Sequence, residues 1–93
     1  MLSRALKIIR DLAESGKVVL TDHADEELRN DALTSKDVRS IIRSGRIVER
    51  QFDTATSESK YLIQGSTKDA DLAEIVCKIG VQQKVVIITI YRI

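Results

Sequence analysis

The residue of this chain best suited to acid–base chemistry is His23, its only histidine. Histidine can give or take a proton near neutral pH without an unusual environment. His23 follows a strand-like run, 17–20, and two good helix N-cap residues, Thr21 and Asp22. The first turn of a helix presents free backbone N–H groups and a positive dipole end, which favour a bound phosphate. His23 is therefore a candidate general acid or base, although an inert surface histidine explains the same position.

The other parts of a metal-free ribonuclease are also present. Such an enzyme needs a base for the ribose 2′-hydroxyl, an acid for the leaving 5′-oxygen, and a cation for the charge on phosphorus. Arg92, directly after the last predicted strand, can hold a phosphate through two N–H groups of its guanidinium. Tyr61 and Tyr91 can donate a proton or stack on a base. Further candidates for contact with RNA are Arg43, Arg46, Lys60 and Lys84.

Each of these residues also has a purely structural explanation. Tyrosines within strands are commonly half-buried, and arginines near a helix C-terminus are favoured by the helix dipole. A penultimate residue such as Arg92 can fray. The acids that follow Thr21 suit the first turns of a helix for the same electrostatic reason, and we interpret them as structural: Asp22, Asp25, Glu26 and Glu27.

Composition limits the class of protein. Ninety-three residues form one domain, 1–93, and aromatic residues make up only 3%, which argues against a base-stacking platform. The formal net charge of +1 means that any affinity for nucleic acid must come from a local patch. One cysteine and one histidine cannot build a structural zinc site, and we expect neither metal nor cofactor. The charged N-terminal stretch resembles neither a signal peptide nor a membrane span, so we expect a cytoplasmic protein.

The hydrophobic pattern predicts helices in the first half of the chain. Helical spacing of apolar residues predicts a first helix that ends at Gly16; its stripe consists of Leu2, Leu6, Ile9 and Leu12. A short helix is expected over 24–30. A third helix should begin after Thr34 and Ser35, with Asp37 in its first turn, and should end at Gly45.

The second half is strand-rich. Strands are expected over 46–52, 60–65, 72–79 and 84–91, separated by loops over 53–59, 66–71 and 80–83. Alternation around Cys77 indicates a half-buried strand with this thiol in the core. The run 84–91 is apolar on both faces, so we expect a central strand covered by helices on one side. The sequence therefore predicts an α+β fold, with N-terminal helices packed on a mainly antiparallel sheet of about four strands.

The whole layout resembles a bacterial and archaeal domain family of unknown function in the barnase–EndoU–colicin–RelE clan of small ribonucleases and toxins. The shared marks are Leu20-Thr21-Asp22-His23-Ala24, the third-helix start at 33–38, Gly45 to Glu49, Tyr61 to Gly65, and the closing strand 85–92. The N-terminal half is also similar to MqsR-type mRNA interferase toxins. The resemblance implies a RelE-like fold, a metal-independent endoribonuclease of a toxin–antitoxin system acting on RNA, and a small antitoxin partner.

The chain departs from the family pattern beside the candidate histidine. After the strand the family usually reads His-Ala-x-x-Arg-(hydrophobic)-x-x-Arg, and Glu27 and Asp31 occupy the arginine positions here. Two anions in place of two cations would repel a phosphate. Two interpretations follow: a ribonuclease that uses His23, or a catalytically silent member that acts as a protein- or RNA-binding or regulatory module. A concave site joining His23 to Arg92 favours the first, and an acidic surface around His23 favours the second.

Overall fold

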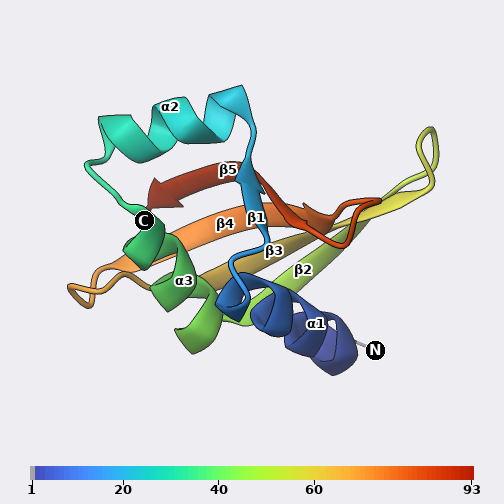
Figure 1. Ribbon diagram of the computed structural model, residues 1–93, viewed down its shortest axis with the longest axis horizontal. Helices are drawn as coiled ribbons and strands as arrows, with labels where there is room; N and C mark the ends of the chain where they lie inside the picture. The colour runs from blue at the N-terminus through green and yellow to red at the C-terminus, as the bar shows by residue number, and fades with distance from the viewer. Residues whose placement is uncertain (1) are drawn as a thin grey trace.

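The computed structural model describes residues 2–93, of which the Leu2 side chain, predicted to belong to the first apolar stripe, lies outside the described part. In this part of the chain three helices precede most of a five-stranded sheet (Figure 1). The elements in chain order are α1 (Leu2–Glu14), β1 (Val18–Leu20), α2 (Asp22–Asn30), α3 (Ser35–Ser44), β2 (Arg46–Asp53), β3 (Glu58–Ser66), β4 (Leu72–Ile79) and β5 (Val85–Arg92).

The sheet has the strand order β1-β5-β4-β3-β2, and its pairs are antiparallel except for the parallel pair β1–β5. The predicted α+β class is confirmed. The sheet has one strand more than the four or so expected, because the three residues of β1 also join it, with Val18 beside Val85. β5 is internal as predicted, but β4 is the middle strand.

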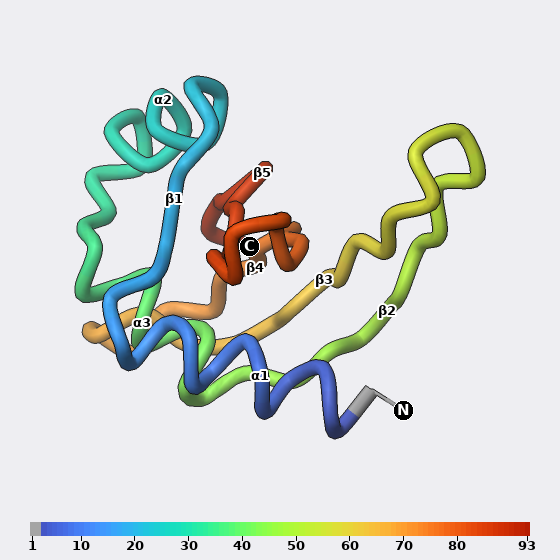
Figure 2. Tube along the Cα trace, turned by 45° about the vertical axis from the view of Figure 1, so that its right-hand side comes forward, coloured from blue at the N-terminus to red at the C-terminus, as the bar shows by residue number. Residues whose placement is uncertain are grey.

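The hydrophobic core lies between the sheet and the helices. α1 and α3 lie against the same face of the sheet, whereas α2 stands beside β5, past the end of β1 (Figures 1 and 2). The fully buried side chains include Ile9, Ile41, Ile42, Ile63, Ile75, Cys77, Val85, Ile87 and Ile90. Cys77 lies in the core as predicted, and burial raises the pKa of its thiol to about 12.

Two glycines and one arginine hold α3 against the sheet. A Cβ on Gly65 would overlap the carbonyl oxygen of Ile41, and a Cβ on Gly45 would lie 2.7 Å from the carbonyl oxygen of Gln64. The end of α3 therefore approaches β3 backbone to backbone. Arg10 of α1 donates to the last carbonyls of this helix, through Nη2 to Gly45 (2.7 Å) and through Nε to Ile42 (3.2 Å). A cation at this end also suits the helix dipole.

The hairpin of β2 and β3 extends well beyond the helices as a curved arm (Figures 1 and 2). Its strands are longer than predicted, because β2 reaches Asp53 and β3 already begins at Glu58, which shortens the expected 53–59 loop. Within residues 2–93, no helix has the length and apolar character needed to cross a membrane.

Candidate functional site

His23 lies in the first turn of α2, where Thr21 fixes the start of the helix. The Thr21 hydroxyl oxygen accepts from the N–H of Ala24 (3.1 Å) and donates to the carbonyl of Ile88 on β5 (3.2 Å). The His23 side chain is 66% exposed, and its Nε2 lies 3.3 Å from Oε1 of Glu27, one turn along the helix. The histidine is therefore accessible, but its nearest charged partner is a carboxylate.

Glu27 and Asp31 serve as backbone acceptors for β5. β1 pairs with β5 only as far as Ile87, so the following N–H groups on this edge lack a strand partner. Glu27 Oε1 accepts from the N–H of Ile90 (3.2 Å), and Asp31 Oδ2 accepts from the N–H of Arg92 (3.0 Å). Two carboxylates thus take the place of the missing strand, which gives Glu27 and Asp31 a structural role.

Arg92 is held at the far end of α2 from His23. Its guanidinium donates to the carbonyl of Asp31, and its Nε lies 3.5 Å from Oδ2 of Asp71. Because Asp31 lies eight positions after His23, at the C-cap of α2, the residue that holds Arg92 is roughly 12 Å from His23 along the helix axis. The structure brings both to the β5 edge but gives them no shared contact.

The two tyrosines lie on opposite faces of the sheet. Tyr61 pairs with buried Cys77 on the face covered by helices, whereas Tyr91 pairs with Glu74 on the outer face and donates its hydroxyl proton to Glu74 Oε2. Neither tyrosine joins His23 to Arg92. Tyr61 and Tyr91, considered above as proton donors or base-stacking groups, therefore do not form one site with His23 and Arg92.

A buried carboxylate on the outer face was not found from the sequence. Glu74 is only 8% exposed, and besides Tyr91 it accepts from Nε2 of Gln64 (2.9 Å). Alternation in β4 correctly places position 74 opposite the core, but it does not reveal that neighbouring strands bury it. The Glu74 carboxylate and the Tyr91 hydroxyl are thus engaged with each other.

The surface beside His23 is acidic. A hollow of about 430 Å³ along α2 is lined by Asp22, Asp25, Glu26, Arg29 and Asn30. Arg29 forms an ion pair with Asp25, which leaves two carboxylates facing the hollow without a cation from this set. Among the described residues, His23, Tyr91 and Arg92 line neither this hollow nor those beside α3 and the end of β4. An anion would be repelled here.

A second hollow, here called the basic hollow, has the opposite charge. It measures about 390 Å³ and is lined by Lys36, Arg39, Ser40 and Arg43 of α3 and by Lys68 of the β3–β4 turn. The four helical residues follow the spacing i, i+3, i+4, i+7, which places them on one face. Among the residues predicted to contact RNA, only Arg43 lies here. The helical spacing of Lys36 and Arg39 is a sequence signal that could have found them.

Side-chain hydrogen bonds bring Lys68 to the basic hollow. Ser40 Oγ donates to the carbonyl of Ser66 (2.7 Å), and Ser44 Oγ accepts from the Ser66 N–H (2.8 Å). Asp37 Oδ1 accepts from the N–H of Lys68 (3.1 Å), while its Oδ2 accepts from the N–H and hydroxyl of Thr34. Burial alone would raise the pKa of Asp37, but these hydrogen bonds and the Lys68 charge outweigh it and hold the pKa below its usual value. The turn is therefore pinned to α3.

The basic hollow keeps a positive balance after its ion pairs are counted. Arg43 Nη2 lies 2.7 Å from Glu14 Oε1, and Lys68 Nζ lies 3.2 Å from Asp69 Oδ2. For Lys36 and Arg39, no carboxylate of the described chain lies within ion-pair distance. Two unneutralised cations beside two partly neutralised ones give this hollow a positive charge that would attract an anion.

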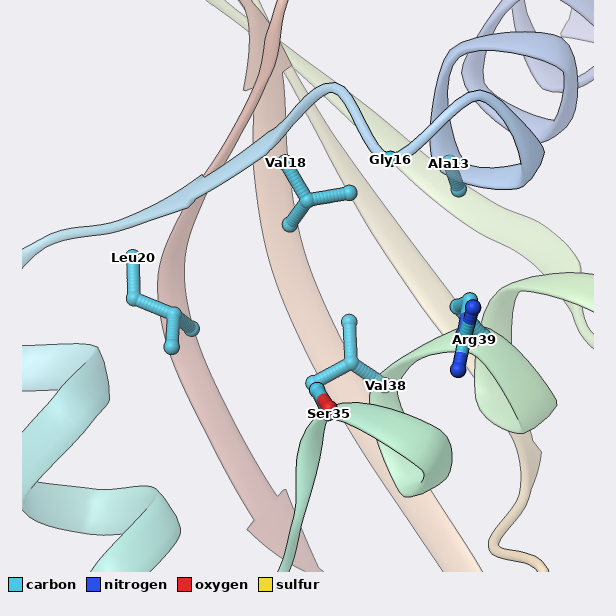
Figure 3. A pocket seen from close by; sticks show the side chains of 7 residues that line it. All are labelled: Ala13, Gly16, Val18, Leu20, Ser35, Val38 and Arg39. Carbon is cyan, nitrogen blue, oxygen red and sulfur yellow. The ribbon is translucent and has the colours of Figure 1, made fainter.

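An apolar hollow adjoins the basic one (Figure 3). It measures about 270 Å³ and lies between the end of α1, β1 and the start of α3; Ala13, Gly16, Val18, Leu20, Ser35, Val38 and Arg39 line it. In Figure 3, Val18, Leu20 and Val38 point into the space between β1 and α3. Arg39 belongs to both hollows and therefore joins them.

The remaining predicted RNA contacts are dispersed. Arg46 pairs with Gln64 and Lys60 with Gln51, which places both on the outer face of the arm. Lys84 lies in the β4–β5 turn. Tyr61 lines a further hollow of about 270 Å³ near the end of β4. None of these lines the basic hollow.

Comparison with known proteins assigns the chain to one family. Residues 20–92 match a domain of unknown function, DUF4258, and the chain belongs to that family. No curated protein and no solved structure is significantly similar to it. The match spans α2, α3 and the strands from β2 to β5, so it includes the α2–β5 edge and the basic hollow.

Proposed function

We propose that this DUF4258 protein is a catalytically silent RNA-binding module that holds single-stranded RNA by its phosphates in the basic hollow. The observation that carries the proposal is the row Lys36, Arg39 and Arg43, joined by Lys68 from a pinned turn. Phosphate contacts dominate the affinity of proteins for nucleic acids. With a net charge of +1, this chain depends on such a local cluster.

Two observations favour single-stranded RNA as the polyanion. The resemblance to the barnase–EndoU–colicin–RelE clan makes RNA the expected partner. The apolar hollow beside Arg39 offers a place for an unstacked base next to bound phosphates, and only single strands present such bases readily. Ser35 at the same hollow supplies a hydroxyl that can bind the polar edge of a base.

The alternative is the metal-independent endoribonuclease with His23 as general acid or base. The contacts at α2 argue against this alternative. Glu27 lies next to His23, and Arg92 is engaged by Asp31 and Asp71. Catalysis would need both groups around one phosphate. The proposal places the protein in the cytoplasm with RNA, and the small antitoxin partner implied by the resemblance stays a prediction.

The direct test is RNA binding by fluorescence anisotropy at several salt concentrations. The double variant Lys36→Ala/Arg39→Ala should lose roughly ten-fold or more in affinity, because two charge-assisted hydrogen bonds to phosphate disappear. The slope of log affinity against log salt should also become shallower, by roughly 0.7 for each phosphate that the variant no longer neutralises. An equal slope in both proteins would contradict the assignment of phosphates to these residues.

The matched control is Lys60→Ala/Lys84→Ala, which removes the same charge outside the basic hollow. It should bind RNA almost as the wild type does. A loss of affinity equal to that of Lys36→Ala/Arg39→Ala would mean that RNA binding depends on net charge alone and not on the basic hollow.

The ribonuclease alternative is tested by incubating the same RNA with wild type and with His23→Ala in the presence of a chelator. Cleavage by wild type that falls roughly 10²–10⁴-fold in His23→Ala would replace the proposal by the ribonuclease alternative.

A further inference from the structure

The two edges of the sheet are treated differently. On the β1 side, α2 covers the edge, and Glu27 and Asp31 accept from the N–H groups of β5. On the other side β2 is the last strand in the order, and its eight residues have β3 on one side only. An uncovered edge strand presents unpaired N–H and C=O groups to another strand. The arm that carries β2 also extends beyond the helices (Figure 2).

We propose that β2 pairs antiparallel with β2 of a second copy of this chain, which forms a symmetric dimer with one continuous sheet. The proposal does not depend on RNA binding. The partner is identified by the pattern of side chains along β2, Arg46-Ile47-Val48-Glu49-Arg50-Gln51-Phe52-Asp53, which complements itself when read in the opposite direction.

The faces of β2 follow from its pairing with β3. The register shifts between Ile47 and Glu49, so Val48 is the extra residue of a bulge. Ile47 lies opposite buried Ile63, which places it on the face covered by helices, and Arg50 and Phe52 share that face farther along the arm. The other face carries Arg46, Glu49, Gln51 and Asp53.

A two-fold axis at Arg50 keeps every pair on a common face. Across this axis Arg46 meets Asp53 of the second copy, Ile47 meets Phe52, and Glu49 meets Gln51. These are an ion pair, an apolar pair and a hydrogen-bonding pair, each favourable between antiparallel strands. A slip of one residue would bring side chains of opposite faces together. The bulge at Val48 is what makes this register consistent.

Charged residues and bulges on an edge strand ordinarily discourage pairing. The charges of β2 discourage pairing with a strand of different sequence. A second copy of β2, by contrast, supplies the opposite charge at both ends of the paired strands. Phe52 is 54% exposed, although it is an aromatic side chain on a strand, and the pairing with Ile47 would cover it. One pair is unfavourable, because Arg50 meets its own copy at the axis. Since the interface is one short strand from each chain, the dimer should be weak and of micromolar order.

Sedimentation velocity over a range of protein concentrations tests the dimer. Wild type should show reversible self-association, and Arg46→Asp should weaken it roughly ten-fold, because both Arg46–Asp53 pairs become like-charged. The double variant Arg46→Asp/Asp53→Arg should restore it. Asp53 also accepts from the N–H of Ala55, so a thermal melt checks that each variant is folded. A wild type that stays monomeric, or a double variant no better than the single one, would overturn the proposal.

Two further variants separate this register from general stickiness. Phe52→Lys should abolish association, whereas Val81→Lys, which changes a 97% exposed apolar residue in the β4–β5 turn, should leave it unchanged. Arg50→Thr should tighten the dimer several-fold by removing the repulsion at the axis. Equal effects of Phe52→Lys and Val81→Lys, or weaker association of Arg50→Thr, would show that β2 does not pair in this way.

Discussion

Helices α2 and α3 are nearly equal in length, nine and ten residues, and each follows a threonine N-cap, but they use their charges differently. The carboxylates Glu27 and Asp31 of α2 turn toward β5 and bind its backbone. The cations Lys36 and Arg39 of α3 turn to solvent around the basic hollow. Glu27 and Asp31 therefore complete the edge of the sheet, whereas Lys36 and Arg39 remain available for a ligand.

This difference changes how the acids near His23 are understood. On sequence alone, Glu27 and Asp31 are repulsive neighbours of a candidate catalytic histidine. In the structure they accept hydrogen bonds from the part of β5 with which β1 is too short to pair. A charged side chain that already hydrogen-bonds to a backbone group gives little indication of a ligand-binding site. A cluster of charged side chains without such partners is a better indication.

The largest effect is expected from Gly65→Ala, which disrupts the close packing of α3 against β3. The new Cβ would overlap the Ile41 carbonyl and lie 2.9 Å from the Gly45 Cα, so α3 must shift. We expect a loss of about 3 kcal/mol in the free energy of unfolding, measured by urea denaturation, and weaker RNA binding. The control is Gly16→Ala, which meets no atom within 4 Å but has a φ of 75°. It should cost about 1 kcal/mol, and equal losses of stability in both variants would contradict the packing argument.

Glu27→Ala tests the structural use of α2. The N–H of buried Ile90 would lose its acceptor, which should lower the free energy of unfolding by about 1–3 kcal/mol. Glu27→Gln keeps an acceptor oxygen and should lose less. RNA affinity should be unchanged in both variants. Unaltered stability in Glu27→Ala would mean that the contact with β5 contributes nothing.

A smaller and pH-dependent effect is expected at the cap of α3. Asp37 has a lowered pKa when folded, so its contribution is present above the ordinary value of 3.8 and is lost as pH falls through the lower folded-state value. Asp37→Asn should cost about 1–2 kcal/mol at neutral pH, and the difference from wild type should shrink in acid. Thr21→Val removes the cap of α2 at a cost of about 1 kcal/mol, but without this pH dependence. Chemical denaturation at several pH values checks both, and a constant Asp37→Asn difference in acid would contradict the assigned ionisation.

The smallest effect is expected at Cys77, which is buried in the core and shielded from solvent. Since burial raises the pKa of its thiol to about 12, the reactive thiolate is scarce at neutral pH. A thiol reagent should label the native protein negligibly and the urea-unfolded protein completely. Rapid labelling of the native protein would show that this part of the core opens.

Much of the fold could be predicted, because it follows from periodicity. The helical spacing before Gly16 and the alternation around Cys77 predict the elements and the buried residues. The strand-like run 17–20 was recognised, but its parallel pairing with β5 could not be predicted, because the pairing is non-local. The bulge at Val48 leaves no mark in the polar and apolar pattern of β2.

The candidate site was less predictable, because it depends on tertiary hydrogen bonds. Arg43 was identified, and the spacing of Lys36 and Arg39 was readable on the same helix. Lys68 was not, since Asp37 brings its turn to α3 through a hydrogen bond over 31 positions. His23 was a candidate because its side chain can transfer protons near neutral pH. Only the structure shows that Glu27 and Asp31 bind β5.

If RNA binds at α3 and not at α2, chemical-shift mapping should distinguish the two helices. A short single-stranded RNA is titrated into ¹⁵N-labelled protein, and the amide signals are followed. We expect shifts at Lys36, Arg39, Ser40 and Lys68, with the amides of α2 and the end of β5 unchanged. Shifts centred on His23, Glu27 and Ile90, with α3 unaffected, would contradict it.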